Sequence, residues 1–226
     1  RLALLSAVAL ASCSPTIDED GGSTPWPAPV VDSEQGDCYG TDRVIDCPSE
    51  GEALYGQDAQ YLRYPSSYRD VDGEMVLDEV TGLVWQWEQI DKVAYDDAES
   101  ICASLDLGGR SWRVPTIHES YSLIRFDGAT GSGDFQSVPD DAVPYIDTGA
   151  FDFAYGDTDA GERFIDVQFI TTSIYVSAAF ADNVGWEVGE ECFFRTNLAD
   201  GRIKCYPTDP RSTFQLRCVS GEEGYG

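Results

Sequence analysis

Cysteine is the residue type in this sequence with the widest chemistry, because it can carry lipid, bind metal, attack a substrate or form a disulfide. The chain has seven cysteines and one histidine, His118. Zinc and thiol-redox sites use closely spaced Cys and His ligands or a C-x-x-C pair, and the sequence has neither. Six cysteines, an even number, are therefore expected to form disulfides, as in exported proteins. These six are Cys38, Cys47, Cys102, Cys192, Cys205 and Cys218.

The seventh cysteine, Cys13, ends a segment typical of exported bacterial proteins. Arg1 is followed by an apolar run over residues 2–10, which is too short to span a bilayer as a helix. Leu10-Ala11-Ser12-Cys13 resembles the lipobox, whose cysteine is acylated and becomes the mature N-terminus. This predicts lipidation of Cys13 and a membrane contact through that lipid. Ser14 favours an outer membrane lipoprotein, periplasmic or exposed at the cell surface; the alternative is an apolar segment that happens to end in cysteine.

Acidic residues dominate the composition, with 41 Asp and Glu against 14 Lys and Arg and a net charge of −27. Phosphate binding needs clustered basic residues, so nucleic acid is excluded as a partner, and sulfated polyanions are disfavoured for the same reason. The acidity has two interpretations, a solvated surface suited to a saline habitat or divalent-cation binding. The second predicts a weak calcium site and no other cofactor. Its candidate ligands are Asp127, Asp134, Asp140 and Asp141.

Composition divides the chain into three parts. Residues 1–13 hold the expected signal peptide and lipobox. Residues 14–37 are rich in acid, Gly and Pro, cannot bury enough surface to offset the ordering entropy, and predict a tether. Residues 38–222 have the length and apolar content of a single globular domain. Within it, long acidic loops over 127–163 are expected to be functional or mobile.

Local patterns predict an α+β domain with two helices, short antiparallel strands and long loops. Residues 75–78 and 83–87 predict two strands joined by a turn, and the alternation in the second places Leu83, Trp85 and Trp87 on one face. Further strands are expected over 164–173, 175–180, 186–188, 192–196, 202–206 and 214–219.

Both helices are expected before these later strands. Apolar residues at helical spacing predict a helix over 93–105. Thr116 with Glu119 forms a capping box that begins a second helix. Asp200-Gly201 predicts a hairpin turn between two of the strands.

Three separated motifs give the sequence a resemblance to a known family. The first is Val76-Leu77-Asp78-Glu79-Val80-Thr81-Gly82-Leu83-Val84-Trp85-Gln86. The second is Cys102 followed by Gly109-Arg110-Ser111-Trp112-Arg113-Val114-Pro115-Thr116 and Glu119, and the third is Leu216-Arg217-Cys218-Val219. In order and spacing, over roughly residues 60–220, they resemble the C-terminal domain of the bacterial collagen-like adhesin Lcl.

The resemblance implies a surface or periplasmic binding module, with a disulfide-stapled fold related to C-type-lectin-like domains. Two departures limit what it implies. The adhesin's domain binds sulfated glycans, but this chain lacks a basic stripe, so that ligand is not carried over. The sequence also contains no collagen-like Gly-X-Y repeat, so trimerisation is not implied.

The motif residues have structural explanations before functional ones. Trp85 and Trp112 are expected in the core, because tryptophan buries the largest apolar area. Arg113 is expected to pair with a carboxylate such as Asp78 or Glu119. The family positions expected to specify the fold are Asp78, Thr81, Gly82, Trp85, Trp112, Arg113, Pro115 and Glu119.

Six cysteines allow fifteen pairings, and sequence alone does not choose among them. The expected set has two local bonds, Cys38–Cys47 across a short loop and Cys192–Cys205 across the Asp200-Gly201 hairpin. Cys102 in the first helix then pairs with Cys218 near the end of the chain, as the lectin-like resemblance also suggests.

The leading functional hypothesis is a non-catalytic recognition or adhesion module that binds an unknown glycan or protein at the cell surface. A structural component of an envelope or extracellular fibre assembly is the alternative. An enzyme of the formylglycine-generating-like fold is disfavoured, because each domain cysteine has an expected partner and His118 is the single histidine that could act as a base. Paired carboxylates for glycosidase chemistry are uninformative in so acidic a chain.

Overall fold

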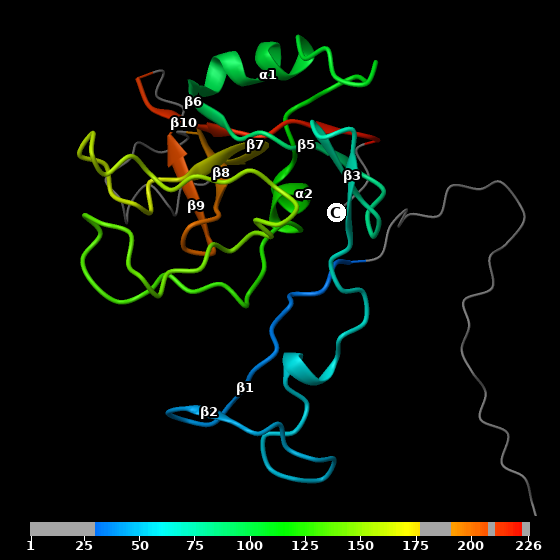
Figure 1. The fold of residues 1–226 in the computed structure, drawn as a ribbon, viewed down its shortest axis with the longest axis vertical. Coiled ribbons are helices and arrows are strands. Elements are labelled where there is room, and N and C mark those ends of the chain that lie inside the picture. The colour runs from blue at the N-terminus through cyan, green and yellow to red at the C-terminus, as the bar shows by residue number, and fades with distance from the viewer. Residues whose placement is uncertain (1–29, 177–190, 208–210, 223–226) are drawn as a thin grey trace, which may run out of the picture.

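The computed structural model describes residues 30–176, 191–207 and 211–222, where short strands outnumber helices (Figure 1). The strands are β1 (Cys38–Tyr39), β2 (Val44–Ile45), β3 (Tyr68–Val71), β4 (Met75–Asp78), β5 (Val84–Gln86), β6 (Ile90–Ala94), β7 (Gln168–Val176), β8 (Glu191–Asn197), β9 (Arg202–Pro207), β10 (Thr213–Leu216) and β11 (Val219–Ser220). The helices are the 3₁₀-helix η1 (Asp58–Gln60), α1 (Tyr95–Ala103) and α2 (Ile117–Tyr121). Within the described ranges, no helix is long and apolar enough to cross a membrane.

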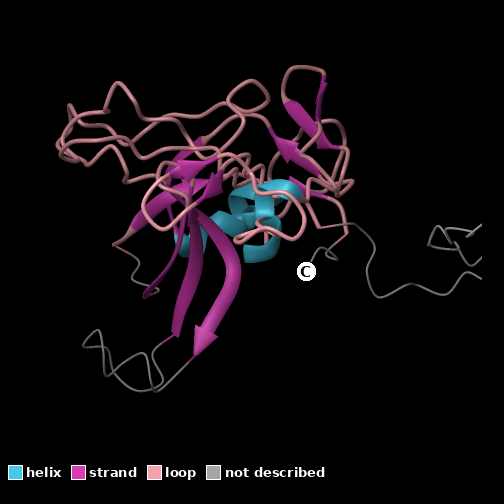
Figure 2. Cartoon of the chain, turned by 90° about the horizontal axis from the view of Figure 1, so that it is seen from below, coloured by secondary structure: helices cyan, strands magenta, loops and turns pink. Residues whose placement is uncertain are grey.

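Most strands belong to two sheets. One has four strands in the order β11-β5-β4-β3, the other five in the order β6-β10-β7-β8-β9, and β1 pairs with β2 in a separate hairpin. The described part of the chain is therefore mainly β-sheet with two α-helices and many loops, and it holds less helix than the α+β prediction implied (Figure 2).

The prediction of purely antiparallel strands is wrong at one position. β10 runs antiparallel to β6, with Phe214 opposite Val93, but parallel to β7, where Gln215 lies opposite Phe169. β10 therefore lies between β6, from the early part of the chain, and β7, from the later part. Such pairing between distant segments leaves no trace in local sequence periodicity, which reports only which face of a strand is buried.

The strands predicted around the first motif are confirmed. β4 and β5 pair antiparallel, with Val76 opposite Trp85. Gly82, in the turn between them, has a φ of 76°, a left-handed conformation that glycine adopts without steric penalty. Trp85 and Trp112 are both buried, as expected.

Both predicted helices exist, but the first is shorter than expected. The helix predicted from residue 93 begins at Tyr95, because Val93 and Ala94 extend β6 and pair with β10. The second helix begins as predicted. Thr116 Oγ1 accepts a hydrogen bond from the Glu119 backbone N–H at 3.2 Å, and the Glu119 carboxylate accepts one from the Thr116 N–H at 2.8 Å.

The later strands follow the prediction with shifted boundaries. The strands predicted over 192–196 and 202–206 are β8 and β9, joined through the expected turn at Asp200-Gly201. The strand predicted over 164–173 begins only at Gln168. It continues past residue 174, where a break between two strands was expected, and forms β7. The stretch predicted over 214–219 is divided into β10 and β11. The strand predicted over 186–188 lies outside the described residues, and β3 was not predicted.

Two hydrophobic clusters form the core. The first surrounds Trp85 and Phe169, and Val76 and Leu83 belong to it. The second surrounds Trp112 and contains both Cys102 and Cys218. The four-stranded sheet contributes to both clusters, since Val76 and Val84 project from its opposite faces.

The structure contains the three disulfides that were expected. They are Cys38–Cys47, Cys102–Cys218 and Cys192–Cys205, with Cα–Cα distances of 5.1, 5.5 and 5.6 Å. The second fixes α1 to the segment between β10 and β11, so it links the early helix to the last strands of the domain.

Residues before the predicted boundary at residue 38 already contact the domain. Asp32 donates a backbone hydrogen bond to the Tyr64 carbonyl at 2.8 Å, and Ser33 accepts one from the Phe126 N–H at 2.8 Å. The last residues of the expected tether are therefore fastened to the domain. They lead into the β1–β2 hairpin, which lies with η1 at one end of the molecule, away from the larger sheets (Figure 1).

Candidate functional site

Asp78, in the first family motif, shapes a turn. Its side chain is fully buried. One carboxylate oxygen accepts hydrogen bonds from the backbone N–H groups of Val80 and Thr81 at 2.9 and 3.2 Å, and the other accepts one from the Thr81 hydroxyl at 2.7 Å. These bonds occupy both oxygens, so Asp78 organises the β4–β5 turn.

Arg113, in the second motif, forms a bidentate ion pair with Glu119. Glu119 is one of the two carboxylates that were expected to pair with Arg113. The Arg113 Nη1 and Nη2 atoms lie 2.8 and 2.6 Å from the two Glu119 oxygens. Glu119 is fully buried, and the Arg113 backbone forms an isolated bridge with Val219. Pro115 accepts a backbone hydrogen bond from Thr172 in β7. This motif therefore joins α2, β7 and β11, which is a structural role.

Arg217, in the third motif, positions an exposed tryptophan. Its guanidinium is buried and donates hydrogen bonds to the carbonyls of Gln86 at 2.8 Å, of Trp87, and of Asp152 at 2.5 Å. Burial lowers the pKa of Arg217 to about 10, so the guanidinium remains charged at neutral pH. A second bond fixes the Trp87 backbone: its backbone N–H donates to the Glu74 carbonyl at 2.9 Å.

Trp87, directly after the first motif, differs from the two tryptophans of the motifs, because 42 % of its surface is exposed. It lines a hollow of about 340 Å³, here called the Trp87 hollow. Val76 and Ala150, which belong to the first core cluster or pack against it, form part of the wall. Trp87 thus faces the same side as Trp85, as the alternation predicted, but it lies at the margin of the core.

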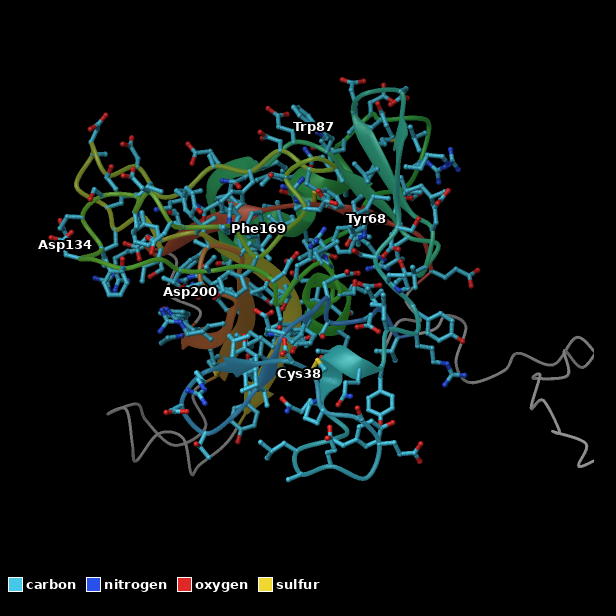
Figure 3. The ribbon with its side chains drawn as sticks, turned by 60° about the horizontal axis from the view of Figure 1, so that its bottom comes forward. Cys38, Tyr68, Trp87, Asp134, Phe169 and Asp200 are labelled. Atoms are coloured by element: carbon cyan, nitrogen blue, oxygen red, sulfur yellow. A yellow bond between two sulfur atoms is a disulfide. The ribbon has the colours of Figure 1, made fainter. Side chains whose placement is uncertain are left out.

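The remaining walls of the Trp87 hollow carry polar side chains. Its full lining is Ser66, Tyr68, Asp70, Gly73, Val76, Trp87, Asp147, Gly149 and Ala150. Figure 3 shows Trp87 and Tyr68 with the side chains of the β3–β4 region. Both charged groups in this lining are carboxylates, so the hollow is suited to a ligand that donates hydrogen bonds or carries positive charge.

The two carboxylates are held in place and keep acceptor capacity. Asp70 accepts a backbone hydrogen bond from Gly73 at 2.6 Å, and Asp147 accepts one from Gly149 at 2.9 Å and pairs with Arg125 at 3.2 Å. Each carboxylate offers about four lone-pair sites, so several stay open. Burial, together with nearby carboxylates, raises the pKa of Tyr68, so its hydroxyl keeps its proton.

A second hollow, of about 410 Å³, lies between α1 and β7. Tyr95 and acidic side chains line it, but two of its polar groups already have partners. The Arg113 guanidinium is bound by Glu119, and the Thr171 hydroxyl donates to the Phe194 carbonyl at 2.6 Å. These two groups are therefore less available to a ligand.

The four carboxylates expected to bind calcium do not come together. Asp127 pairs with Arg125 at 2.5 Å, Asp141 accepts hydrogen bonds from Ser132, and Asp134 lies at the far end of the loops in Figure 3. In the ranges that the structure describes, no three His, Cys, Asp or Glu side chains form a group that could hold a metal ion. The expectation of a site from Asp127, Asp134, Asp140 and Asp141 is thus corrected: short-range turns and ion pairs separate them.

Two other residues were singled out from the sequence. Cys13 is outside the described residues. His118 is exposed on α2. Among the residues of the Trp87 hollow, Tyr68, Asp70 and Trp87 were not marked as functional by sequence patterns, and Asp147 lies in the 127–163 loops that were expected to be functional or mobile. The signal for Trp87 was present, since it ends the strand predicted over 83–87, whose preceding inward positions are filled by the buried Leu83 and Trp85.

The fold and its bonds define a β-rich, disulfide-linked, strongly acidic domain with an aromatic hollow at the margin of its core. A family model, described as the Lcl C-terminal domain, matches residues 74–220. The chain therefore belongs to the Lcl C-terminal domain family, which indicates a surface-associated domain. The match begins at β4, later than the roughly residue 60 expected from the motifs. No curated protein and no solved structure matches the chain.

Proposed function

We propose that this chain is a non-catalytic recognition module on a bacterial outer membrane lipoprotein, and that the Trp87 hollow is its binding site. The observation that carries the proposal is an exposed tryptophan whose backbone is fixed by Arg217 and Glu74, above a hollow lined by two carboxylates. A rigid aromatic surface loses little conformational entropy on binding, which is why tryptophan is common among residues that dominate binding energy.

The chemistry of the hollow favours a neutral glycan over a sulfated one. The apolar face of a sugar ring can pack on Trp87, and its hydroxyls can donate to Asp70 and Asp147. A sulfate group would be repelled by the same carboxylates and by the net charge of −27. A protein ligand with a basic side chain meets the same requirements, and an array that carries both classes separates the two.

Replacing Trp87 with alanine is expected to weaken binding of the array-identified ligand by at least about tenfold, since a central anchor contributes roughly 2 kcal/mol or more. Tyr121→Ala is the matched control, because Tyr121 is also 42 % exposed but lies on α2. Calorimetric titration of both variants gives the comparison. Equal affinity of Trp87→Ala and the wild type would refute this site, and ordered filaments without ligand would favour a fibre component instead.

Lipidation of Cys13 is the second part of the proposal. The lipobox-like segment and the odd cysteine support it, because the three disulfides use the other six. Labelled palmitate is expected to enter the wild type expressed in a bacterial host and not the Cys13→Ala variant. Equal labelling of the two would contradict the anchor.

A relation to C-type-lectin-like domains completes the proposal. It is supported by the Cys102–Cys218 bond, which ties an early helix to the end of the chain, and by the loop-rich segment between α2 and β7. Superposition of an experimentally determined structure on lectin-like domains tests it, and a different strand order would reject it.

A further inference from the structure

Arg195, in the middle of β8, is a buried cation without a hydrogen-bonding partner. Its side chain is shielded from solvent, and none of its three guanidinium nitrogens has a partner among the described residues. The guanidinium carbon instead lies over three aromatic rings, 3.8 Å from the ring centre of Phe193, 4.5 Å from that of Tyr206, and against Phe214. Such contacts offset part of the desolvation penalty, but a buried ion normally also requires a counter-charge.

Gln168, in β7, is a second buried side chain with an open polar end. It is 5 % exposed, its Nε2 lies 3.2 Å from the Tyr206 hydroxyl, and its Oε1 has no partner in the described part of the chain. Turning the amide over would pair Oε1 with the hydroxyl and leave Nε2 open instead. One end of the amide is therefore free in either orientation.

Gln168 lines a hollow of about 220 Å³, here called the Tyr206 hollow. Tyr206 and Phe214 also line it, and the Arg195 guanidinium, which is not part of the lining, packs over these two rings. Its lining also holds four charged side chains, Lys92, Arg163, Glu162 and Asp166. Its volume is large enough for one small organic molecule and too small for an extended chain.

The charges that line the Tyr206 hollow are balanced, Lys92 and Arg163 against Glu162 and Asp166, in contrast to the acidic excess of the whole chain. Each basic side chain near it has a carboxylate partner among the described residues except Arg195. The ion pairs are Lys92–Glu162, Arg163–Asp166, and Arg202 and Lys204 sharing Asp200. One further anion would balance Arg195 without displacing any of these pairs.

We propose that the Tyr206 hollow binds a small hydroxylated carboxylate of the size of a single sugar acid. The carboxylate provides the counter-charge for Arg195, reaching it by rotation of the Tyr206 ring, and a hydroxyl of the ligand bonds to the open end of Gln168. This site lies on the five-stranded sheet, apart from the Trp87 hollow, so it goes beyond the function proposed above.

Calorimetric titration of the full chain with sodium galacturonate tests the proposal, with galactose, acetate and sulfate as matched ligands. Galacturonate is expected to bind at least about tenfold more tightly than galactose, which lacks the charge, and more tightly than acetate, which lacks the hydroxyls. No heat with galacturonate would overturn the proposal. Equal binding of sulfate would also overturn it, because it would indicate a site for any anion.

The Arg195→Met variant supplies the residue-level test. Removing an unpaired buried charge should leave the fold intact, since apolar replacements of buried ions are often neutral or stabilising. Galacturonate affinity is expected to fall at least about tenfold, while Arg69→Met, an exposed arginine on β3, and Trp87→Ala leave it unchanged. If Arg195→Met does not fold, Tyr206→Phe replaces it and should also weaken binding. Wild-type affinity in the folded variant would refute the site.

Discussion

Replacement of both Cys102 and Cys218 by alanine is expected to lower the free energy of unfolding by about 4–5 kcal/mol. The bond closes a loop with a sequence separation of 116, so it removes more entropy from the unfolded chain than either other disulfide. Both cysteines are also fully buried in the second core cluster, where their loss removes packing contacts. The melting temperature measured without reductant should fall by at least about 10 °C.

The matched control is Cys38→Ala with Cys47→Ala. This bond has a sequence separation of 9, for which the same loop-entropy relation gives about 2–3 kcal/mol. The hairpin that it closes lies at one end of the molecule, outside the family match. A larger loss of stability for the Cys38–Cys47 variant than for the Cys102–Cys218 variant would contradict the central role given to the long-range bond.

Features of the fold that depend on neighbouring residues could be predicted from the sequence. The β4–β5 turn was predicted because Asp78, Thr81 and Gly82 have the chemistry of a tight turn, and the hydrogen bonds of the Asp78 side chain stay within it. The capping box at Thr116 was predictable for the same reason. Cys192 and Cys205 could be paired because a recognisable hairpin turn separates them by a short distance.

Features that depend on distant residues could not be predicted. The position of Trp87 is set by Arg217, which lies 130 residues away in sequence. The first helix begins late because its predicted first turn pairs with β10 instead. The composition of the acidic loops suggested a cation site. In the structure, however, their carboxylates pair with arginines such as Arg125 or accept hydrogen bonds within local turns. Composition counts charges, whereas a site requires that they converge.

Replacement of Glu119 by glutamine is expected to lower the free energy of unfolding by about 3 kcal/mol, the lower end of the range for breaking a buried ion pair. Glu119 is fully buried and accepts hydrogen bonds from the two terminal guanidinium nitrogens of Arg113. Glutamine keeps the shape and can still accept the hydrogen bond from Thr116, so the change removes mainly the charge. The Arg113 side chain is 23 % exposed, and water reaching it limits the loss. Urea unfolding measures the change.

Glu79→Gln is the control for this prediction, because it breaks another Arg–Glu pair in the same domain. Its partner is Arg69 at 3.1 Å, and both side chains are largely exposed, so the expected change is about 0–1 kcal/mol. In the double variant Arg113→Met with Glu119→Leu, apolar side chains replace both charges, and part of the stability should return. Equal losses of stability for Glu119→Gln and Glu79→Gln would show that burial does not strengthen the Arg113–Glu119 pair. Backbone contacts alone would then connect α2 to β11.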